Sequence, residues 1–168
     1  MATGREGNQS QPLVAAGILL GVGLAGFFDG IVFHQILQWH QMLASVLPAT
    51  SVYNIKQNMF WDGLFHAVMY GISCTGIWFL WRAGQRGKVP GASNLFGGAL
   101  LLGAGLFNLI EGAINHQILG IHHLKPGANQ LAWDLGFLAC SAILAAAGWI
   151  VLRGGIQDAP TSGYSRSK

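Results

Sequence analysis

The chain has 168 residues, of which only 9% are charged and 52% are hydrophobic. The length suits one domain, and the composition is too apolar for an ordinary soluble domain. The composition is that of a membrane protein, so we expect the lipid bilayer as a partner. The formal net charge of +3 is then expected to reflect membrane topology and not nucleic-acid binding.

Four apolar stretches predict membrane-spanning helices, in chain order at about 12–44, 57–81, 93–123 and 130–152. Each reaches the roughly 20 helical residues that are needed to cross a hydrocarbon core. A polar N-terminal segment, 1–11, precedes them, and a glycine-containing stretch, 154–168, predicts a flexible tail. We therefore expect an all-α integral membrane protein with a four-helix transmembrane domain over residues 12–153.

The basic residues predict the orientation of these helices. Seven lie at the two termini or in the middle loop, and two lie in the other loops: Arg5, Arg82, Arg86, Lys88, Arg153, Arg166 and Lys168 against Lys56 and Lys125. Cytoplasmic loops carry the excess of Lys and Arg. The bias predicts a protein of the bacterial inner membrane with both termini, and hence segments 1–11 and 154–168, in the cytoplasm.

An internal repeat relates the two halves of the chain. The segment Phe28–His40 recurs as Ile110–His122, with the acid, the glycine, both histidines and a Gln-Ile-Leu run in register. The pair Trp61-Asp62 recurs as Trp133-Asp134. Both hairpins begin and end on the same side, so we predict a four-helix bundle built from two parallel helix-hairpin repeats.

The polar groups of the apolar stretches gather at one end of the predicted bundle, on the periplasmic side. Ten of them are candidate metal ligands: Asp29, His34, His40, Asp62, His66, Glu111, His116, His122, His123 and Asp134. Acids are costly in lipid and no Lys or Arg lies in the helices beside them. Protonation, hydrogen bonding or bound cations can compensate them, and two divalent ions offset four carboxylates. The predicted site is therefore a di- or multinuclear carboxylate–histidine centre.

Taken singly, these residues have simpler interpretations. One histidine in a membrane helix often bonds across the bundle, and Asp62 and Asp134 are placed where helix caps occur. His122 and His123 also suit a solvated helix end, or an outer entry site together with His40. The spacing of Asp29 to His34 is i,i+5, about 140° apart on an ideal α-helix. Either the two side chains face different neighbours, or a π-bulge aligns them.

These motifs resemble a family of bacterial four-helix predicted membrane proteins without assigned function. The resemblance covers about residues 12–153 and implies a respiratory or metal-handling setting. Respiratory-chain subunits or quinone are expected partners, because an open metal centre near quinone depth can pass electrons. Separately, Asp62-x-x-x-His66 is similar to part of the copper site of membrane methane and ammonia monooxygenases. That second match is only two residues long.

Mixed carboxylate and imidazole ligands favour iron, with copper or zinc as alternatives. The main expectation is a membrane metal-dependent oxidoreductase with redox or oxygen-related chemistry. A b-type haem protein with axial ligands His34 and His116 is the first alternative. A metal-handling protein for respiratory oxidase assembly is another, and the chain is also a candidate homo-oligomer. Transport across the bilayer is disfavoured, because no polar path continues to the cytoplasmic end.

Overall fold

The computed structural model describes residues 3–157. Helix α1 (Thr3–Phe28) continues directly into the π-helix η1 (Asp29–Ile36), and α2 (Val52–Gly84) returns beside it. Helix α3 (Ala92–Glu111) likewise continues into η2 (Gly112–Ile118), and α4 (Gln130–Gln157) follows. The predicted all-helical fold with four helices is confirmed.

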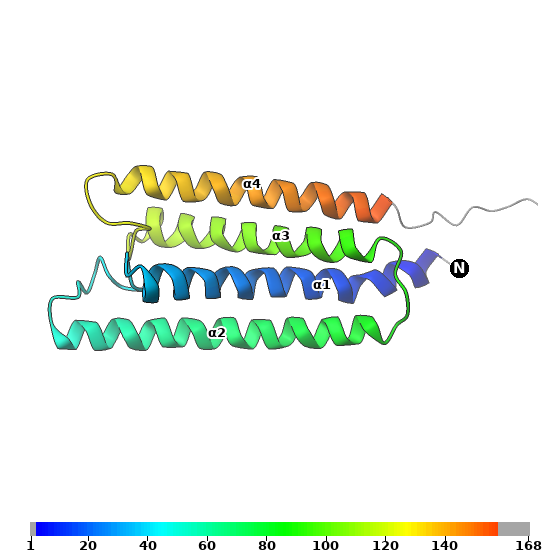
Figure 1. Ribbon diagram of the computed structural model, residues 1–168, viewed down its shortest axis with the longest axis horizontal. Helices are drawn as coiled ribbons and strands as arrows, with labels where there is room; N and C mark the ends of the chain where they lie inside the picture. The colour runs from blue at the N-terminus through cyan, green and yellow to red at the C-terminus, as the bar shows by residue number, and fades with distance from the viewer. Residues whose placement is uncertain (1–2, 158–168) are drawn as a thin grey trace, which may run out of the picture.

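The four helices lie side by side in the order α2, α1, α3, α4, as Figure 1 shows. Helix α1 packs on α2 and α3, and α3 packs on α4. Within residues 3–157, the outer helices α2 and α4 do not meet each other. The bundle is therefore flat, with α1 and α3 at its centre.

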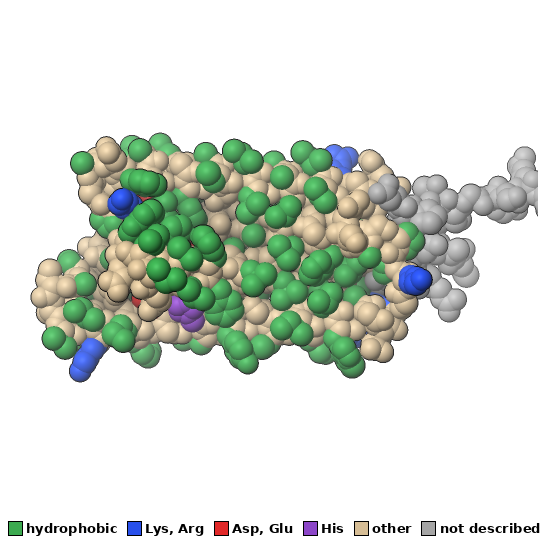
Figure 2. Space-filling view, in the orientation of Figure 1, with side chains coloured by type: hydrophobic (Ala, Val, Ile, Leu, Met, Phe, Trp, Pro, Cys, Tyr) green, Lys and Arg blue, Asp and Glu red, His purple; other side chains and the backbone are tan. Residues whose placement is uncertain are grey.

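Four segments are long and apolar enough to cross a membrane: Ser10–Ile36, Val52–Gly84, Ala92–Ile118 and Gln130–Gln157. Hydrophobic side chains cover the middle of the face in Figure 2, and the Lys and Arg side chains visible there lie toward its two ends. Helix α4 runs to Gln157, beyond the predicted end at 153. The rest of the predicted tail, from residue 158 on, lies outside the described residues, as do residues 1–2 of the N-terminal segment.

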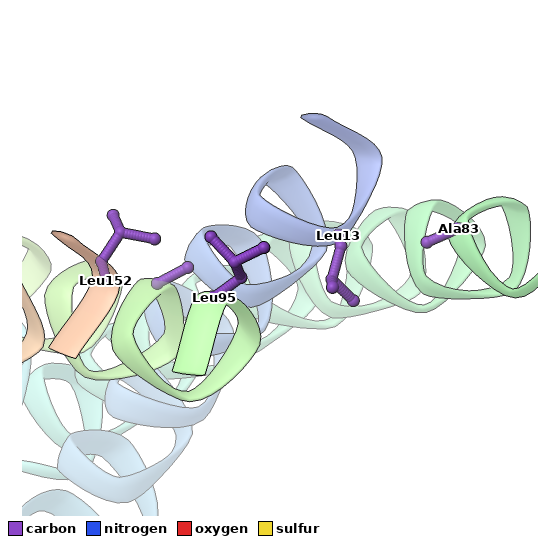
Figure 3. Packing of buried hydrophobic residues seen from close by; sticks show 5 residues of the cluster. Leu13, Ala83, Leu95 and Leu152 are labelled. Carbon is purple, nitrogen blue, oxygen red and sulfur yellow. The ribbon is translucent and has the colours of Figure 1, made fainter. Parts of the chain in front are cut away.

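An apolar core closes the end of the bundle where α1 and α3 begin. It contains Leu13 of α1, Ala83 of α2, Leu95 and Ala99 of α3, and Leu152 of α4 (Figure 3). Leu95 and Ala99 are almost completely buried. The buried ionisable side chains of the described residues all lie toward the opposite end, where α1 and α3 finish as π-helices.

Glycines allow the two central helices to approach closely. A Cβ added at Gly103 of α3 would overlap the backbone carbonyl of Ile18 in α1, whereas one added at Gly97 would meet nothing within 4 Å. Small residues permit this kind of contact between membrane helices. Close packing of α1 on α3 matters for the polar end, because each of these helices, with the π-helix that continues it, carries one buried acid and one buried histidine.

We expect Gly103→Ala to destabilise the protein by about 1–3 kcal/mol, because overpacking forces the two backbones apart. The matched Gly97→Ala should be neutral or slightly stabilising, since alanine is the better helix former. Thermal unfolding in detergent, followed by circular dichroism, compares the two. Equal melting temperatures for both variants would contradict the close contact of α1 with α3.

Candidate metal centre

The π-helices bring each acid to the histidine five residues later. The i→i+5 bonds Leu37 N–H to Val32 O and Leu119 N–H to Ile114 O are both 2.8 Å long. His34 Nε2 then lies 3.2 Å from Asp29 Oδ2. The π-helical option for the i,i+5 spacing is confirmed, in both halves of the chain.

A tight turn follows each π-helix and carries the next histidine back toward the acid. Gln38 has φ 52° and Gly120 has φ 58°, both left-handed. The residue after each of them bonds back to the π-helix: Trp39 N–H donates to Phe33 O at 3.0 Å, and Ile121 N–H donates to Asn115 O at 3.1 Å. The two turns have the same construction, 82 positions apart.

The two turns predict opposite responses to substitution. Gly120→Ala should cost about 1–2 kcal/mol, because a Cβ disfavours left-handed backbone. Gln38→Gly should be neutral or stabilising, since glycine relieves that cost and loses only about 0.5–1 kcal/mol through chain entropy. Chemical or thermal unfolding in detergent measures both. A stable Gly120→Ala variant would show that the turn is not needed in this form.

His40 and His122 connect the two halves of the site. The Nδ1–H of His40 donates to Leu124 O at 2.8 Å, and the Nδ1–H of His122 donates to Met42 O at 3.0 Å. Their rings stack with centroids 4.8 Å apart and an interplanar angle of 12°. Each loop therefore fixes the histidine of the other loop, with Nε2 left to face inward.

Asp62 and Asp134 contact the Nδ1 atoms of the other two histidines, His34 and His116. Asp62 Oδ1 lies 3.0 Å from His34 Nδ1 and accepts the Met42 N–H at 2.9 Å. Asp134 Oδ1 lies 3.3 Å from His116 Nδ1 and accepts the Leu124 N–H at 2.8 Å. The acids thus accept from loop amides and do not cap their own helices. Carboxylates in this position orient histidine ligands of metals.

Four imidazoles and two acids converge in the interior as a result. The Nε2 atoms of His34, His40 and His116 are buried without a hydrogen-bond partner among the described residues. Two groups have ligand atoms that all lie within 4.8 Å of one another, and they share one histidine: Asp29, His34 and His40, and His40, His116 and His122.

Glu111 joins the second group, as Asp29 joins the first. Its Oε1 lies 2.9 Å from His122 Nε2 and 3.8 Å from His116 Nε2, and it accepts from Asn115 Nδ2 at 3.1 Å. On the other side, Asp29 Oδ1 lies 3.9 Å from His40 Nε2. Ligand atoms bound about 2.1 Å from one ion lie roughly 3–4.2 Å from each other. The separations of 3.8 and 3.9 Å fall in that interval, whereas the 2.9 Å between Glu111 Oε1 and His122 Nε2 is a hydrogen-bond distance.

Two of the predicted ligands lie apart from both groups. His66 donates from Nδ1 to Asp62 O at 2.8 Å, and its Nε2 faces the backbone of Gly30. His123 is 20% exposed, and its Nδ1 contacts Asp134 Oδ2 at 2.7 Å. Together with Asp62 and Asp134, these residues surround the converging side chains. The arrangement differs from the predicted one, in which His40, His122 and His123 were outer residues and seven formed the inner shell: Asp29, His34, Asp62, His66, Glu111, His116 and Asp134.

The site is buried, and among residues 3–157 no lysine or arginine pairs with its acids. Asp62 and Asp134 are each 1% exposed, and every ion pair that the four acids form within residues 3–157 is with histidine. Lys125 lies over the rings of Trp39 and Trp133. Burial, followed by repulsion from His34 and His122, lowers the pKa of His40 to about 3. A neutral imidazole with a free Nε2 is the form that binds metals.

Some residues that shape the site carried no signal in the sequence. The backbone carbonyls of Met42 and Leu124 fix two histidines, and a carbonyl is present at every position. Asn58 is completely buried, accepts from Leu43 N and donates to Leu47 O, and so holds the first loop. Its only visible sign was an amide at the polar start of the second apolar helix.

Comparisons with known proteins complete the description of the chain. No curated protein and no solved structure matches it. Residues 16–155 match the family described as "Predicted membrane protein (DUF2243)". They include all ten candidate ligands and all of the four-helix fold except the first part of α1 and the last two residues of α4. The chain belongs to this family of membrane proteins of unknown function.

Proposed function

We propose that this membrane protein holds two metal ions, one in each half of the buried site. The first ion binds Asp29, His34 and His40, and the second binds Glu111, His116 and His122. The observation that carries the proposal is the orientation of the imidazoles. Their Nδ1 atoms face protein oxygens, and their Nε2 atoms converge on two carboxylates.

Charge balance supports two divalent ions. Four carboxylates lie buried between apolar helices, and an unpaired buried charge costs several kcal/mol. Two divalent cations supply four positive charges, which equals the charge of Asp29, Asp62, Glu111 and Asp134. With metals bound, the histidines can stay neutral. Asp29 and Glu111 would then bind the ions directly, and Asp62 and Asp134 would each lie one imidazole away from an ion.

The ligand set favours iron and redox chemistry. Two histidines and one carboxylate on each ion leave coordination positions open, as in non-haem iron(II) oxygenases. Copper and zinc accept the same nitrogen and oxygen ligands. We assign the protein to the membrane metal-dependent oxidoreductases, with oxygen-related chemistry at the two ions. A protein that delivers metal for oxidase assembly would use the same ligands, but it would release its ions readily to a chelator.

Haem binding is the weaker candidate for this geometry. The ring of His34 contacts His40 and His122 at centroid distances of 4.5 and 5.9 Å, and the ring of His116 contacts the same two at 6.1 and 5.0 Å. The rings of His40 and His122 therefore occupy the space between the two proposed axial ligands. A porphyrin placed there would have to displace both.

The proposed setting is the bacterial inner membrane, with both termini cytoplasmic and the metals near the periplasmic face. The distribution of basic residues supports that orientation. The equivalent contacts found 82 positions apart support two parallel hairpin repeats. His66 breaks the equivalence, because Leu138 takes its place beside Gly112.

Element analysis of protein purified without chelators tests the proposal. We expect two iron ions per chain and no Soret band near 410–430 nm, the approximate range for ligated haem. Two zinc ions would support the site and reject the redox role. Protein that contains no metal, and binds none when iron(II), zinc(II) or copper(II) is added, would reject the proposal.

A further inference from the structure

A groove leads from the bundle surface to the first metal position. It has a volume of about 300 Å³ and is lined by residues of α1, η1, α3 and α4, including Phe28, Phe33, Phe137 and Asp29. Phe28 is 58% exposed, so the groove meets the surface there. All these residues lie in membrane-spanning segments, so the molecules that reach the groove come from the lipid phase.

An unpaired amide lies in this groove. Asn108 of α3 lines it together with Asp29, and within residues 3–157 its side chain forms no hydrogen bond. An amide without a partner in hydrocarbon costs several kcal/mol. The occupant of the groove is therefore expected to bring a hydrogen-bonding oxygen to Asn108.

A second groove provides a natural comparison. Its volume is about 510 Å³, and it ends at Glu111 and Asn115, with Leu106 and Phe107 on its wall. There the amide of Asn115 already donates to Glu111 Oε1. The second groove thus has no polar group that requires a ligand.

We propose that the groove at Asp29 binds a membrane quinone or quinol. Its head is a planar ring with oxygen atoms, which fits three phenylalanine walls and the free amide of Asn108. Its apolar tail would leave past Phe28 into lipid. Cavities of about 300 Å³ and larger hold ligands of this size. The inference names a redox partner for the proposed metal centre and rests on that centre.

Binding of a tritiated decyl-tailed benzoquinone to the protein in nanodiscs tests the inference. We expect about one probe per chain at saturation. Asn108→Leu, which keeps the volume and removes the amide, should weaken binding about tenfold, the effect of one lost hydrogen bond of about 1.4 kcal/mol. Cys140→Phe, which fills the groove, should abolish binding, and Leu106→Phe, which fills the second groove, should leave it unchanged.

Metal content, measured on the same samples, separates this inference from the proposed function. Metal-loaded protein that fails to bind the probe overturns the quinone site alone, whereas metal-free protein that accepts no ion overturns the centre. Unchanged binding in Asn108→Leu and Cys140→Phe also overturns the site. Displacement of the probe by an equal concentration of 1-decanol would show a general apolar groove and overturn the quinone assignment.

Discussion

Replacing His40 with leucine is expected to remove the first metal ion from the purified protein and to weaken binding of the second. His40 is the one residue that belongs to both groups of converging ligands. Loss of an outer hydrogen bond to a metal ligand already lowers metal affinity about 10–100-fold, and loss of the ligand itself should exceed that. Element analysis of protein that keeps its helical circular dichroism spectrum measures the effect.

His66→Leu is the matched control for that experiment. Both changes remove one buried imidazole near the same end of the bundle, but His66 Nε2 faces Gly30 and lies outside both groups. The equivalent position in the second half is already Leu138. We expect His66→Leu to retain two ions. If it lost metal as His40→Leu does, His66 would have to be a ligand and the assignment of ligands would be wrong.

Neutralising the two central acids should remove one ion each. Asp29→Asn should lose the ion of the first half and Glu111→Gln that of the second, because each amide is a poor ligand in place of a carboxylate. The double variant should contain no metal. Titration with iron(II) under anaerobic conditions counts the remaining sites in each protein.

Stability gives an independent readout of the same variants. A ligand present at 100 times its dissociation constant stabilises the folded state by about 2.7 kcal/mol. Chelation should therefore lower the melting temperature of the native protein clearly, and that of the double variant hardly at all. An equal chelator response in both proteins would contradict metal binding by Asp29 and Glu111.

Much of the fold could be predicted from the sequence. The four helices follow from apolar stretches that are long enough to span a bilayer, and four such helices are observed. The first and third end at Ile36 and Ile118, before the predicted 44 and 123, because a left-handed turn follows each π-helix. The π-helices were one of two options, because Asp29 and His34 are five residues apart and Gly30 directly follows the acid. For the π-helices, the spacing between the acid and the histidine was therefore more informative than the helix propensity of the residues.

The division of the candidate ligands into inner and outer residues could not be predicted. Asp62 and Asp134 were expected to bind metal, yet both contact the Nδ1 side of a histidine and accept loop amides. The orientation of these two carboxylates depends on the loops that contain Met42 and Leu124, whose amides bond to Asp62 and Asp134. Those loops are held by backbone groups, which have no sequence signature.

His66 illustrates the same difficulty on a regular helix. It lies one turn from Asp62, so the spacing placed both on one face of α2. The Nδ1–H of His66 instead donates to the backbone carbonyl of Asp62, and the His66 ring packs against Gly30, where there is no side chain. The sequence predicts the face of a helix, whereas the direction of a ring within that face depends on its neighbours.

The most direct test is an experimental density map of the protein, purified without chelators and recorded across the iron absorption edge. We expect two anomalous peaks, one among Asp29, His34 and His40 and one among Glu111, His116 and His122. A map in which these side chains contact only each other and water, with no ion between them, would contradict the proposed metal centre.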